Sequence, residues 1–224
     1  MMNKLAVAID GPAGAGKSTV AKMVAAHFGL LYIDTGAMYR ALTYKILRDQ
    51  IDMNNEAAVH QILTNTTIEL KMSDREQAVY LDHEDVTNKI RSREVNANVS
   101  KVAAYQHVRE EMVRQQQLLA KHGDVIMDGR DIGTYVMPFA KVKIFLNATV
   151  AERAKRRHEE NLKKGIPSDL LTLTEEIAKR DHLDATRAFA PLKKATDALE
   201  IDTTSMSIDE VVQNIIQIVE KNCD

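Results

Sequence analysis

The stretch IDGPAGAGKST, residues 9–19, decides how this chain folds. A continuous apolar run, Leu5 to Ile9, leads into it, and such a run indicates a strand covered on both faces in a parallel sheet. Beyond the stretch, apolar residues recur at helical spacing until Gly29, namely at Val20, Met23, Val24 and Phe28. The glycine-rich stretch therefore joins a buried strand to a helix.

Within this stretch, GPAGAGKS matches G-x-x-x-x-G-K-[ST], the phosphate-binding motif, in the strand-loop-helix context that the motif requires. Small residues let backbone N–H groups close round a phosphate at the positive end of the helix dipole. We expect Lys17 to reach the β- and γ-phosphates and the Ser18 hydroxyl to ligate Mg²⁺, which implies ATP or GTP with magnesium. The residues expected to line the triphosphate are Gly11, Pro12, Ala13, Gly14, Ala15, Gly16, Lys17, Ser18 and Thr19.

Composition limits the classes of protein to which the chain can belong. With 224 residues, 45% hydrophobic and 28% charged, it predicts one globular domain and excludes fibrous, collagen-like and largely disordered chains. Thirty Lys and Arg against 32 Asp and Glu give a net charge of -2, which argues against bulk attraction to nucleic acid or anionic lipid. The single cysteine, Cys223, can form neither an intrachain disulfide nor a multi-cysteine metal site. No apolar run has the length of a signal peptide or a membrane span, so no membrane partner is expected. The single cysteine fits a reducing cytoplasm best, and we expect a monomer there, with no nucleic-acid partner.

Further apolar runs alternate with helical patterns along the rest of the chain. Four more strands are predicted, at residues 30–33, 125–127, 142–146 and 198–201. A turn is expected at 34–36, before a second helix. Thr149 with Glu152 and Ser207 with Glu210 have capping-box spacing, which marks the starts of two later helices. The alternation predicts an α/β fold with a parallel central sheet and helices on both faces.

One segment breaks this alternation. Between about 66 and 90, the runs TIELKM, AVYLD and DVTNKI are rich in β-branched and aromatic residues, and the polar turns SDREQ and HE separate them. We interpret the segment as an antiparallel insert. The residues that follow, 94–122, carry apolar positions at helical steps and are predicted to form helix until Gly123.

Charged residues outside the phosphate-binding loop limit the reactions that the protein is expected to catalyse. The base-reading run N-K-x-D or T-K-x-D of a GTPase is absent, and Asp128, at the end of the third apolar run, is expected to hold magnesium through water. Arginines are placed near predicted strand ends and on helices, at Arg40, Arg130, Arg153, Arg156, Arg157, Arg180 and Arg187. Such fixed guanidinium groups can neutralise two polyanions, so the set favours phosphoryl transfer to a second phosphate. Any one of these arginines could instead be a solvated or ion-paired surface residue.

The chain resembles bacterial-type cytidylate kinases in four motifs that occur in the same order and spacing: GPAGAGKS, DTGAMYR, DGRDIG and RDHLDATRAFAPL. Members of that family are nucleoside monophosphate kinases that phosphorylate CMP and dCMP with ATP. The resemblance covers essentially the whole chain and implies a single P-loop kinase domain. Its core would occupy about 1–55, 94–150 and 190–224, an acceptor-binding antiparallel β insert about 64–93, and a helical lid about 152–168.

Carried over position by position, the resemblance implies a CMP site. The matching positions are Thr35, Tyr39 and Arg40 in the D-[ST]-G-x-x-Y-R element, Arg130, Arg40 and Arg187 for the phosphate, Arg180 and Asp184 for the ribose, and Ser100, Arg109 and Asp131 for the base. A carboxylate can accept from the cytosine N4 amino group, and a hydroxyl and a guanidinium can satisfy N3 and O2. From the residues alone, Ser100 could instead face solvent from a helix, and Arg109 could pair with a neighbouring glutamate.

The resemblance also implies a lid and a reaction. It assigns Arg153, Arg156 and Arg157 to the lid over ATP, and it makes Lys17, Arg130, Arg156 and Arg157 the catalytic residues. The expected reaction is direct in-line transfer of the γ-phosphate of MgATP to CMP or dCMP, which gives ADP and CDP or dCDP. Two alternatives stay open. One is a kinase for another small acceptor, such as UMP or shikimate, which would lack the base-reading set, and the other is a regulatory module that binds ATP without transfer.

Overall fold

The chain folds round a five-stranded parallel sheet, and the computed structural model describes residues 5–72, 77–121 and 123–223. The strands follow the order β2-β6-β1-β7-β8, so the strand that precedes the glycine-rich loop lies at the centre. The strands are β1 (Ala6–Asp10), β2 (Leu31–Asp34), β6 (Val125–Gly129), β7 (Val142–Asn147) and β8 (Leu199–Asp202). All five predicted strands are therefore present, and each ends one or two residues later than predicted.

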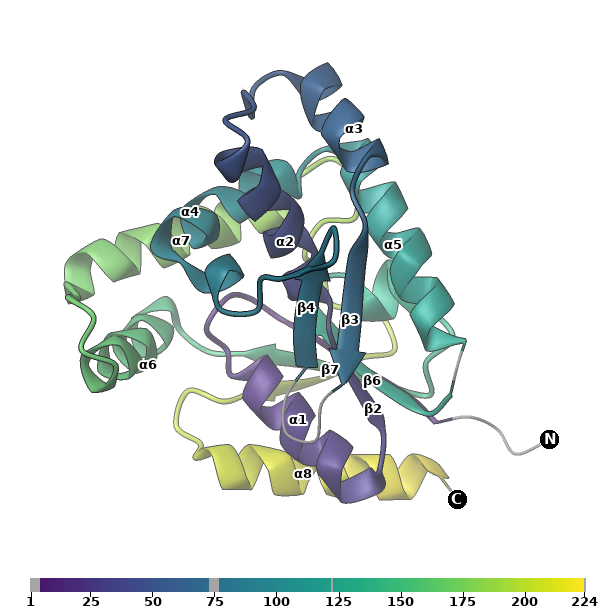
Figure 1. Ribbon diagram of the computed structural model, residues 1–224. Coiled ribbons are helices and arrows are strands. Elements are labelled where there is room, and N and C mark those ends of the chain that lie inside the picture. The colour runs from purple at the N-terminus through teal and green to yellow at the C-terminus, as the bar shows by residue number, and fades with distance from the viewer. Residues whose placement is uncertain (1–4, 73–76, 122, 224) are drawn as a thin grey trace.

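Helices cover both faces of this sheet. On one face, α1 (Lys17–Phe28) and α8 (Ile208–Cys223) bury Val7 and Ile9 of β1 in one core cluster. The opposite face of β1 carries Ala6 and Ala8, which lie in the cluster that also holds residues of α5 (Gln106–Ala120) and the short helix η2 (Ile132–Val136). The lower layer of Figure 1 is the α1 and α8 side. Helices on both faces were predicted, and the structure confirms them.

A second layer of helices stands above the sheet. It comprises α2 (Thr35–Arg48), α3 (Glu56–Thr64), α4 (Arg93–Val102) and α5, which share one apolar cluster. The helical structure predicted over 94–122 is confirmed within the described residues except at the break between α4 and α5. At this break the Arg109 guanidinium donates to the Ala103 carbonyl at 3.4 Å, and the Tyr105 hydroxyl donates to the Met53 carbonyl at 2.6 Å. Helix α3 had no counterpart in the sequence prediction.

The predicted turn at 34–36 is also wrong, because β2 passes directly into α2. Asp34 is the last residue of the strand and the N-cap of the helix, and its Oδ1 accepts from the Ala37 amide at 3.0 Å. A capping carboxylate satisfies an amide that would otherwise lack a partner in the first turn. The short connection brings the start of α2 beside the end of the central strands.

The antiparallel insert is present, though its third run behaves differently from the prediction. Its strands are β3 (Ile68–Met72), β4 (Gln77–Leu81) and β5 (Glu84–Asp85). The predicted strand DVTNKI stops at Asp85, whose carboxylate accepts from both the amide and the hydroxyl of Thr87 and turns the chain into η1 (Lys89–Arg91). Most of the predicted turn SDREQ, residues 73–76, lies outside the described residues. Side chains of the insert pack on α2.

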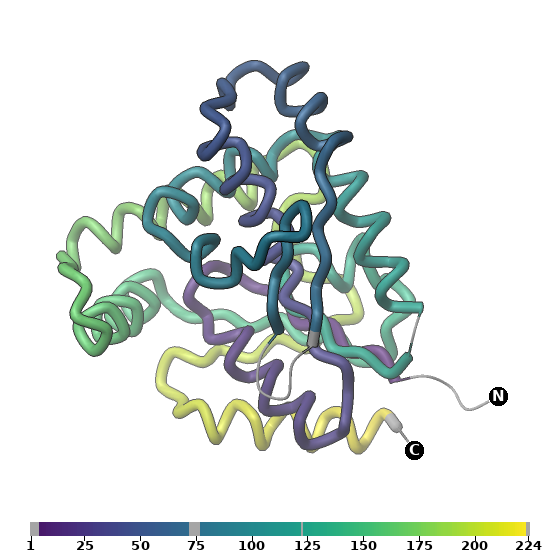
Figure 2. Tube along the Cα trace, viewed as in Figure 1, coloured from purple at the N-terminus to yellow at the C-terminus, as the bar shows by residue number. Residues whose placement is uncertain are grey.

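Two long helices, α6 (Val150–Lys163) and α7 (Leu170–Thr186), pack against each other and form an arm at the side of the molecule (Figure 2). The Thr149 hydroxyl accepts from the Glu152 amide at 3.2 Å, so the predicted start of α6 is confirmed. At α8 the capping box is complete, because Glu210 accepts from Ser207 and Ser207 accepts from the Glu210 amide.

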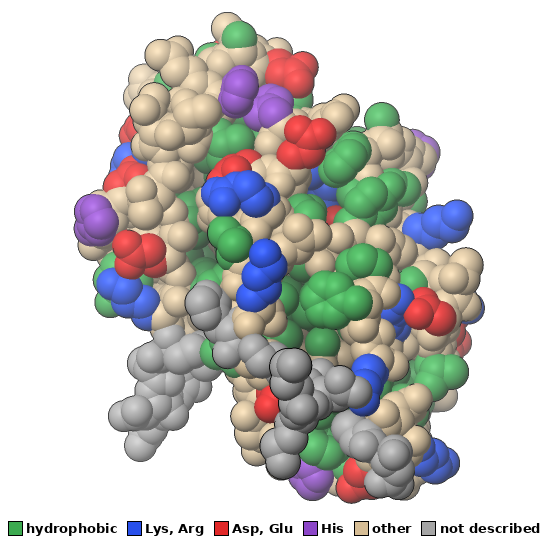
Figure 3. Space-filling view, turned by 90° about the vertical axis from the view of Figure 1, so that its right-hand side faces the viewer, with side chains coloured by type: hydrophobic (Ala, Val, Ile, Leu, Met, Phe, Trp, Pro, Cys, Tyr) green, Lys and Arg blue, Asp and Glu red, His purple; other side chains and the backbone are tan. Residues whose placement is uncertain are grey.

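One face of the surface shows the near-zero net charge as a mixture of charged side chains. On the face drawn in Figure 3, basic and acidic side chains are interspersed among hydrophobic and polar ones. Within the described part of the chain, every helix is too short or too polar to span a bilayer.

Candidate active site

The phosphate-binding loop connects β1 to α1, and two of its glycines are required by geometry. Gly11 has φ +148°, and a Cβ built on it would lie 2.0 Å from the Leu146 carbonyl oxygen of β7. Gly16 lies before α1 with φ 84°, in the left-handed region, and no side chain of the described residues caps the helix there. The first amides of α1 are therefore left for an anion, as the motif predicts.

Lys17 begins α1 and folds back over the loop. Its ammonium donates to the Pro12 carbonyl at 2.6 Å, and the residue is only 5% exposed. Burial lowers the pKa of Lys17 well below its usual value, and the charge of Arg130 acts in the same direction, while Asp128 opposes them. A lysine held among other cations is suited to a polyanion, because the anion would relieve that repulsion.

Asp128, at the end of β6, gathers three hydroxyl groups. Ser18 donates to its Oδ2 at 2.8 Å, Tyr32 donates to its Oδ1 at 2.8 Å, and Thr35 donates to its backbone carbonyl at 2.7 Å. Burial raises the pKa of the Asp128 carboxyl group, and the charge of Asp34 adds to this effect. The Ser18 hydroxyl and the Asp128 carboxylate are thus adjacent, as predicted.

This donor set fits magnesium. Hydroxyl and carboxylate oxygens are hard ligands, and Mg²⁺ in proteins commonly takes one or two side-chain oxygens together with substrate phosphates and waters. Among the described residues, no group of three or more His, Cys, Asp or Glu side chains could hold a metal alone. Ser18 and Asp128 are consequently the residues of this site that could hold the ion beside a bound triphosphate.

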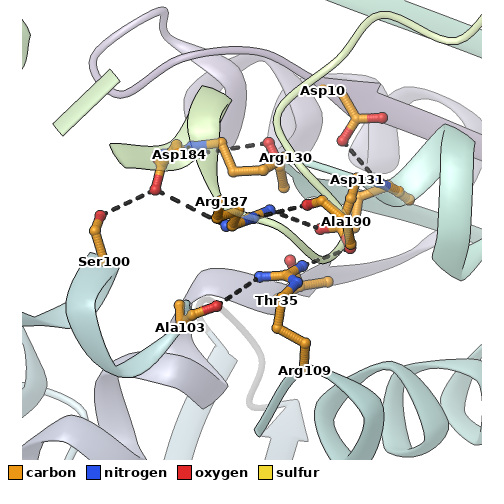
Figure 4. Close-up of polar contacts among 12 residues, drawn as sticks. Asp10, Thr35, Ser100, Ala103, Arg109, Arg130, Asp131, Asp184, Arg187 and Ala190 are labelled. Atoms are coloured by element: carbon orange, nitrogen blue, oxygen red, sulfur yellow. Dashed lines mark hydrogen bonds and ion pairs between the residues drawn. The ribbon is translucent and has the colours of Figure 1, made fainter. Parts of the chain in front are cut away.

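Asp131 and Asp184 are the buried acids of the predicted acceptor site (Figure 4). An Arg109 nitrogen lies 2.5 Å from Oδ2 of Asp131, and both side chains are at most 5% exposed. Arg187 lies between the two acids, 3.8 Å from Asp131 and 3.9 Å from Asp184. Arg109 and Asp131, predicted to read the base, therefore share one buried network with Arg187, predicted for the phosphate, and Asp184, predicted for the ribose.

Ser100 and Arg130 approach the same network from two other elements. The Ser100 hydroxyl, on α4, donates to Oδ1 of Asp184 at 3.0 Å, and the residue is 8% exposed, so the solvent-facing alternative is wrong. Arg130, which follows β6, donates from Nε to Oδ2 of Asp184 at 2.9 Å. The alternative that Arg109 pairs with a neighbouring glutamate is also wrong, because its partner is Asp131.

The residues of the D-T-G-x-x-Y-R element lie along the start of α2. An Arg40 nitrogen lies 2.7 Å from Oδ2 of Asp34, and Arg91 of η1 lies 3.3 Å from the same oxygen. The Tyr39 ring faces the Arg109 guanidinium, 5.0 Å from its centroid. Arg40 is therefore ion-paired in this state of the protein, and Tyr39 borders the network round Asp131.

Arg180, on α7, completes a cluster of cations. Burial lowers its pKa to about 10, and the charges of Arg130, Arg40 and Arg157 act in the same direction, while Asp184 opposes them. Its Nε is buried without a hydrogen-bond partner among the described residues. Arg130 and Arg180 also lower the pKa of Lys17. Cations from α1, from the end of β6 and from α7 thus converge on one place, which is the arrangement that a phosphate site requires.

The three arginines of the predicted lid have different surroundings. Arg153 is 3% exposed, and its guanidinium donates to the Ala13 carbonyl of the loop at 2.9 Å and lies 2.6 Å from Asp181 of α7. Arg156 donates to the hydroxyl and the carbonyl of Thr203, and Arg157 is 43% exposed at its side chain. Only Arg153 touches the phosphate-binding loop.

Four residues of this region were not predicted as site residues. They are Asp10, Tyr32, Asp34 and Gln116. Asp10, Tyr32 and Asp34 lie at or near strand ends, where the carboxyl ends of parallel strands meet, and that position is the signal that could have found them. Gln116 is 1% exposed and lies near the Tyr39 hydroxyl, two helical turns after Arg109 on the same face of α5.

Known proteins resemble the chain over nearly its whole length. The family model described as cytidylate kinase matches residues 7–221 of the chain. A cytidylate kinase of Geobacillus sp. (strain WCH70) is 61% identical over 219 residues, which are 98% of each chain. A cytidylate kinase of Anoxybacillus flavithermus is 58% identical over 224 residues, which are 100% of each chain. Among solved structures, an uncharacterized protein from Eubacterium ventriosum has a TM-score of 0.52 at 14% identity, with 98% of this chain and 99% of that chain covered, and this likeness concerns the fold alone. The chain belongs to the cytidylate kinase family.

Proposed function

We propose that the protein transfers the γ-phosphoryl group of MgATP to CMP or dCMP, which gives ADP and CDP or dCDP. The observation that carries the proposal is the convergence of Lys17, Arg130 and Arg180: the charges of both arginines lower the pKa of Lys17, and the charge of Arg130 also lowers the pKa of Arg180. Two polyanions must approach each other in such a reaction, and fixed cations at their meeting point neutralise the charge that develops during transfer. The names of the relatives and of the matching family support CMP as the acceptor.

The donor side would be the loop of residues 11–19. Its open amides and Lys17 would hold the β- and γ-phosphates, and Ser18 and Asp128 would hold Mg²⁺, which supplies charge neutralisation on the phosphate oxygens when it is bound. Lys17 would exchange the Pro12 carbonyl for a phosphate oxygen. The adjacency of Ser18 and Asp128 at 2.8 Å supports this assignment.

The acceptor side would be the network of buried acids and arginines. Arg130, Arg40 and Arg187 would hold the CMP phosphate, Arg180 and Asp184 the ribose, and Ser100, Arg109 and Asp131 the base, with Thr35 and Tyr39 beside them. An oxygen of the CMP phosphate would attack the γ-phosphorus in line, and the β–γ bridging oxygen would leave with ADP. Lys17 and Arg130 would stabilise the transferring group, so no covalent intermediate with the enzyme is needed.

The lid would comprise about 152–168, which is most of α6 and the connection to α7. The core would comprise about 1–55, 94–150 and 190–224, and the acceptor-binding insert about 64–93. Arg156 and Arg157 would turn toward ATP when both substrates are bound, and Arg153 would tie the arm to the loop. The contact of Arg153 with the Ala13 carbonyl supports the last role. We further propose that the protein works as a monomer in the cytoplasm, since one cysteine suits a reducing compartment.

An ADP-release assay over a panel of acceptors tests the proposal. The panel contains CMP, dCMP, UMP, AMP, shikimate and a reaction without acceptor, each with ATP and Mg²⁺. We expect ADP release that depends on CMP or dCMP and is slower with UMP. Preferential use of shikimate or UMP would favour another kinase, and ATP binding without acceptor-dependent release would favour a regulatory module.

A further inference from the structure

Asp10 is a buried acid to which the proposed reaction gives no role. It is the last residue of β1 and directly precedes Gly11, and it is 4% exposed. Its Oδ1 accepts from the Ile132 amide and its Oδ2 from the Gly133 amide, each at 2.8 Å. Both carboxylate oxygens are thus used on backbone that lies 122 and 123 residues further along the chain.

The two amides belong to the segment that carries the acceptor site. Asp131 stands at the N-cap of η2, and its own side chain forms no cap hydrogen bond to that helix. Asp10, at the end of β1, caps this helix in place of Asp131, because its carboxylate satisfies the first two amides of η2. The side chain of Asp131 is consequently free to face Arg109, as Figure 4 shows.

We propose that Asp10 is a positioning residue for base recognition: by holding the amides of Ile132 and Gly133, it fixes the direction of the Asp131 carboxylate and couples the phosphate-binding loop to the acceptor site. The inference rests on the proposed function, since it assumes that Asp131 faces the base. One carboxylate joins the two halves of the site, because its own backbone leads into Gly11 and its hydrogen bonds reach the residues that follow Arg130 and Asp131.

The surroundings of Asp10 agree with this role. Lys143 lies close to the same helix start, since a Cβ added at Gly133 would lie 3.2 Å from Lys143 Cδ and 3.4 Å from Asp10 Oδ2. The Lys143 ammonium is nevertheless directed elsewhere, to the Pro138 carbonyl and to Asp197, each at 2.7 Å. The hydrogen bonds of the Asp10 carboxylate therefore go to η2 and not to this lysine.

Two substitutions test the role from opposite sides of the contact. Asp10→Asn keeps the shape of the side chain but turns an amide group toward one of the two backbone donors, so one hydrogen bond is lost. Gly133→Ala leaves Asp10 in place and brings a methyl group against its Oδ2. Val219→Ala, in the buried cluster of α1 and α8, is the matched control, because it destabilises the fold at a site remote from the acceptor.

The readouts are kcat and KM for CMP, UMP and ATP, together with the folded fraction. We expect Asp10→Asn to lower the CMP-to-UMP ratio of kcat/KM by about tenfold and to raise KM for CMP, with Gly133→Ala acting in the same direction more weakly. The control is expected to leave the ratio and all three KM values unchanged, since a purely structural loss lowers only the amount of active enzyme.

The outcomes separate the positioning role from the proposed function. An unchanged ratio in both variants, with turnover lowered only in proportion to the folded fraction, would overturn the positioning role while CMP phosphorylation by the unaltered protein stands. If the unaltered protein does not prefer CMP, the proposed function fails first, and the inference falls with it. If Asp10→Asn yields no folded protein, Gly133→Ala decides alone.

Discussion

Arg130 and Asp184 form a hydrogen-bonded ion pair, with Nε 2.9 Å from Oδ2, although 54 positions separate them in the sequence. The acid is nearly buried, with 5% of its side chain exposed. Burial by itself would raise the pKa of Asp184, but the charges of Arg130, Arg180 and Arg187 outweigh it and hold that pKa below its usual value. Without a nucleotide, this one carboxylate compensates several guanidinium groups that the proposed function assigns to phosphate and ribose.

Asp184→Asn should therefore destabilise the protein. Removal of one partner from a buried pair leaves uncompensated charge, which typically costs about 3 to 5 kcal/mol of the free energy of unfolding. Urea denaturation at neutral pH measures this loss, and added inorganic phosphate should restore part of it by supplying an anion. The control is Glu200→Gln, which removes an exposed pair with Lys194 and should cost less than about 1 kcal/mol. Equal effects of the two substitutions would contradict the prediction.

Lys17→Met should abolish most turnover while it leaves the fold intact. The side chain is buried and its charge lies among other cations, so methionine keeps much of its volume and removes the donor that would follow the migrating phosphoryl group. Loss of such a preorganised donor typically lowers kcat by about 100- to 1,000-fold or more. Lys22→Met, an exposed position on the same helix, is the control. A folded Lys17→Met variant with turnover near that of the control would argue against the assigned site.

Much of the fold follows from residue patterns whose cause is local. The phosphate-binding loop, the five parallel strands and the start of α8 depend on buried strand runs, on glycines with forced backbone angles and on a capping box. The wrong turn at 34–36 had the same composition as a real turn. Whether these residues form a turn or the start of a helix depends on whether the Asp34 carboxylate caps that helix, and composition does not show this. For DVTNKI, the side chain of Asp85 similarly ends the strand after its first residue.

The candidate site, like the fold, could be predicted from the sequence only in part. The phosphate-binding motif and the series of arginines could be named from the sequence, and the family resemblance gave the individual arginines their expected roles. Partners could not be named, since the contact of Ser100 with Asp184 spans 84 positions and that of Asp10 with Ile132 spans 122. Such contacts arise only when parallel strands bring distant segments to one edge of the sheet.

Replacing both Arg156 and Arg157 with alanine should lower turnover more than it weakens CMP binding. The pair is proposed to act on ATP after both substrates are bound, so its loss affects the closed complex and not the acceptor site. Steady-state kinetics and calorimetry with CMP measure the two effects, and a melting curve accounts for the lost contact of Arg156 with Thr203. Lys155→Ala, exposed on the same helix, is the control. Weaker CMP binding with unchanged turnover at saturation would show that the lid role is wrong.

The stability of the protein should depend on pH through Asp10. Burial raises the pKa of Asp10 to about 7, although its two backbone hydrogen bonds oppose the shift. Between about pH 4 and pH 7, the folded state therefore keeps a proton on Asp10 that the unfolded state has released. As pH rises through this window, the free energy of unfolding falls by at most about 1.4 kcal/mol per pH unit on account of this group.

Urea denaturation between about pH 5 and pH 8 tests this dependence on Asp10. The difference in free energy of unfolding, unaltered protein minus Asp10→Asn, should fall with rising pH up to about pH 7 and then level off. Asp202→Asn is the control, because hydrogen bonds from Thr204 lower the pKa of Asp202 and its titration lies below the range. A constant difference across the range for Asp10→Asn would mean that this acid stays charged throughout.

Asp131→Asn should weaken the choice between CMP and UMP. The carboxylate lies 2.5 Å from Arg109, so it is held in one direction and can only accept, which suits the N4 amino group of cytosine and opposes O4 of uracil. An asparagine can turn either its oxygen or its amide toward the base. A mismatched buried polar group costs about 1 to 3 kcal/mol, so the CMP-to-UMP ratio of kcat/KM should fall by roughly tenfold.

The ratio should be measured for single substitutions at Ser100, Arg109 and Asp131, with Glu110→Gln beside Arg109 as the control. Because Arg109 holds Asp131 and Ser100 contacts Asp184 instead, we expect the order of effects to be Asp131, then Arg109, then Ser100. Arg109→Lys keeps the charge but loses the planar guanidinium beside Asp131. The CMP-to-UMP ratio of this variant should therefore fall more than half as far as that of Arg109→Ala. An unchanged ratio in all three positions would mean that the base is recognised elsewhere, even if CMP phosphorylation itself is observed.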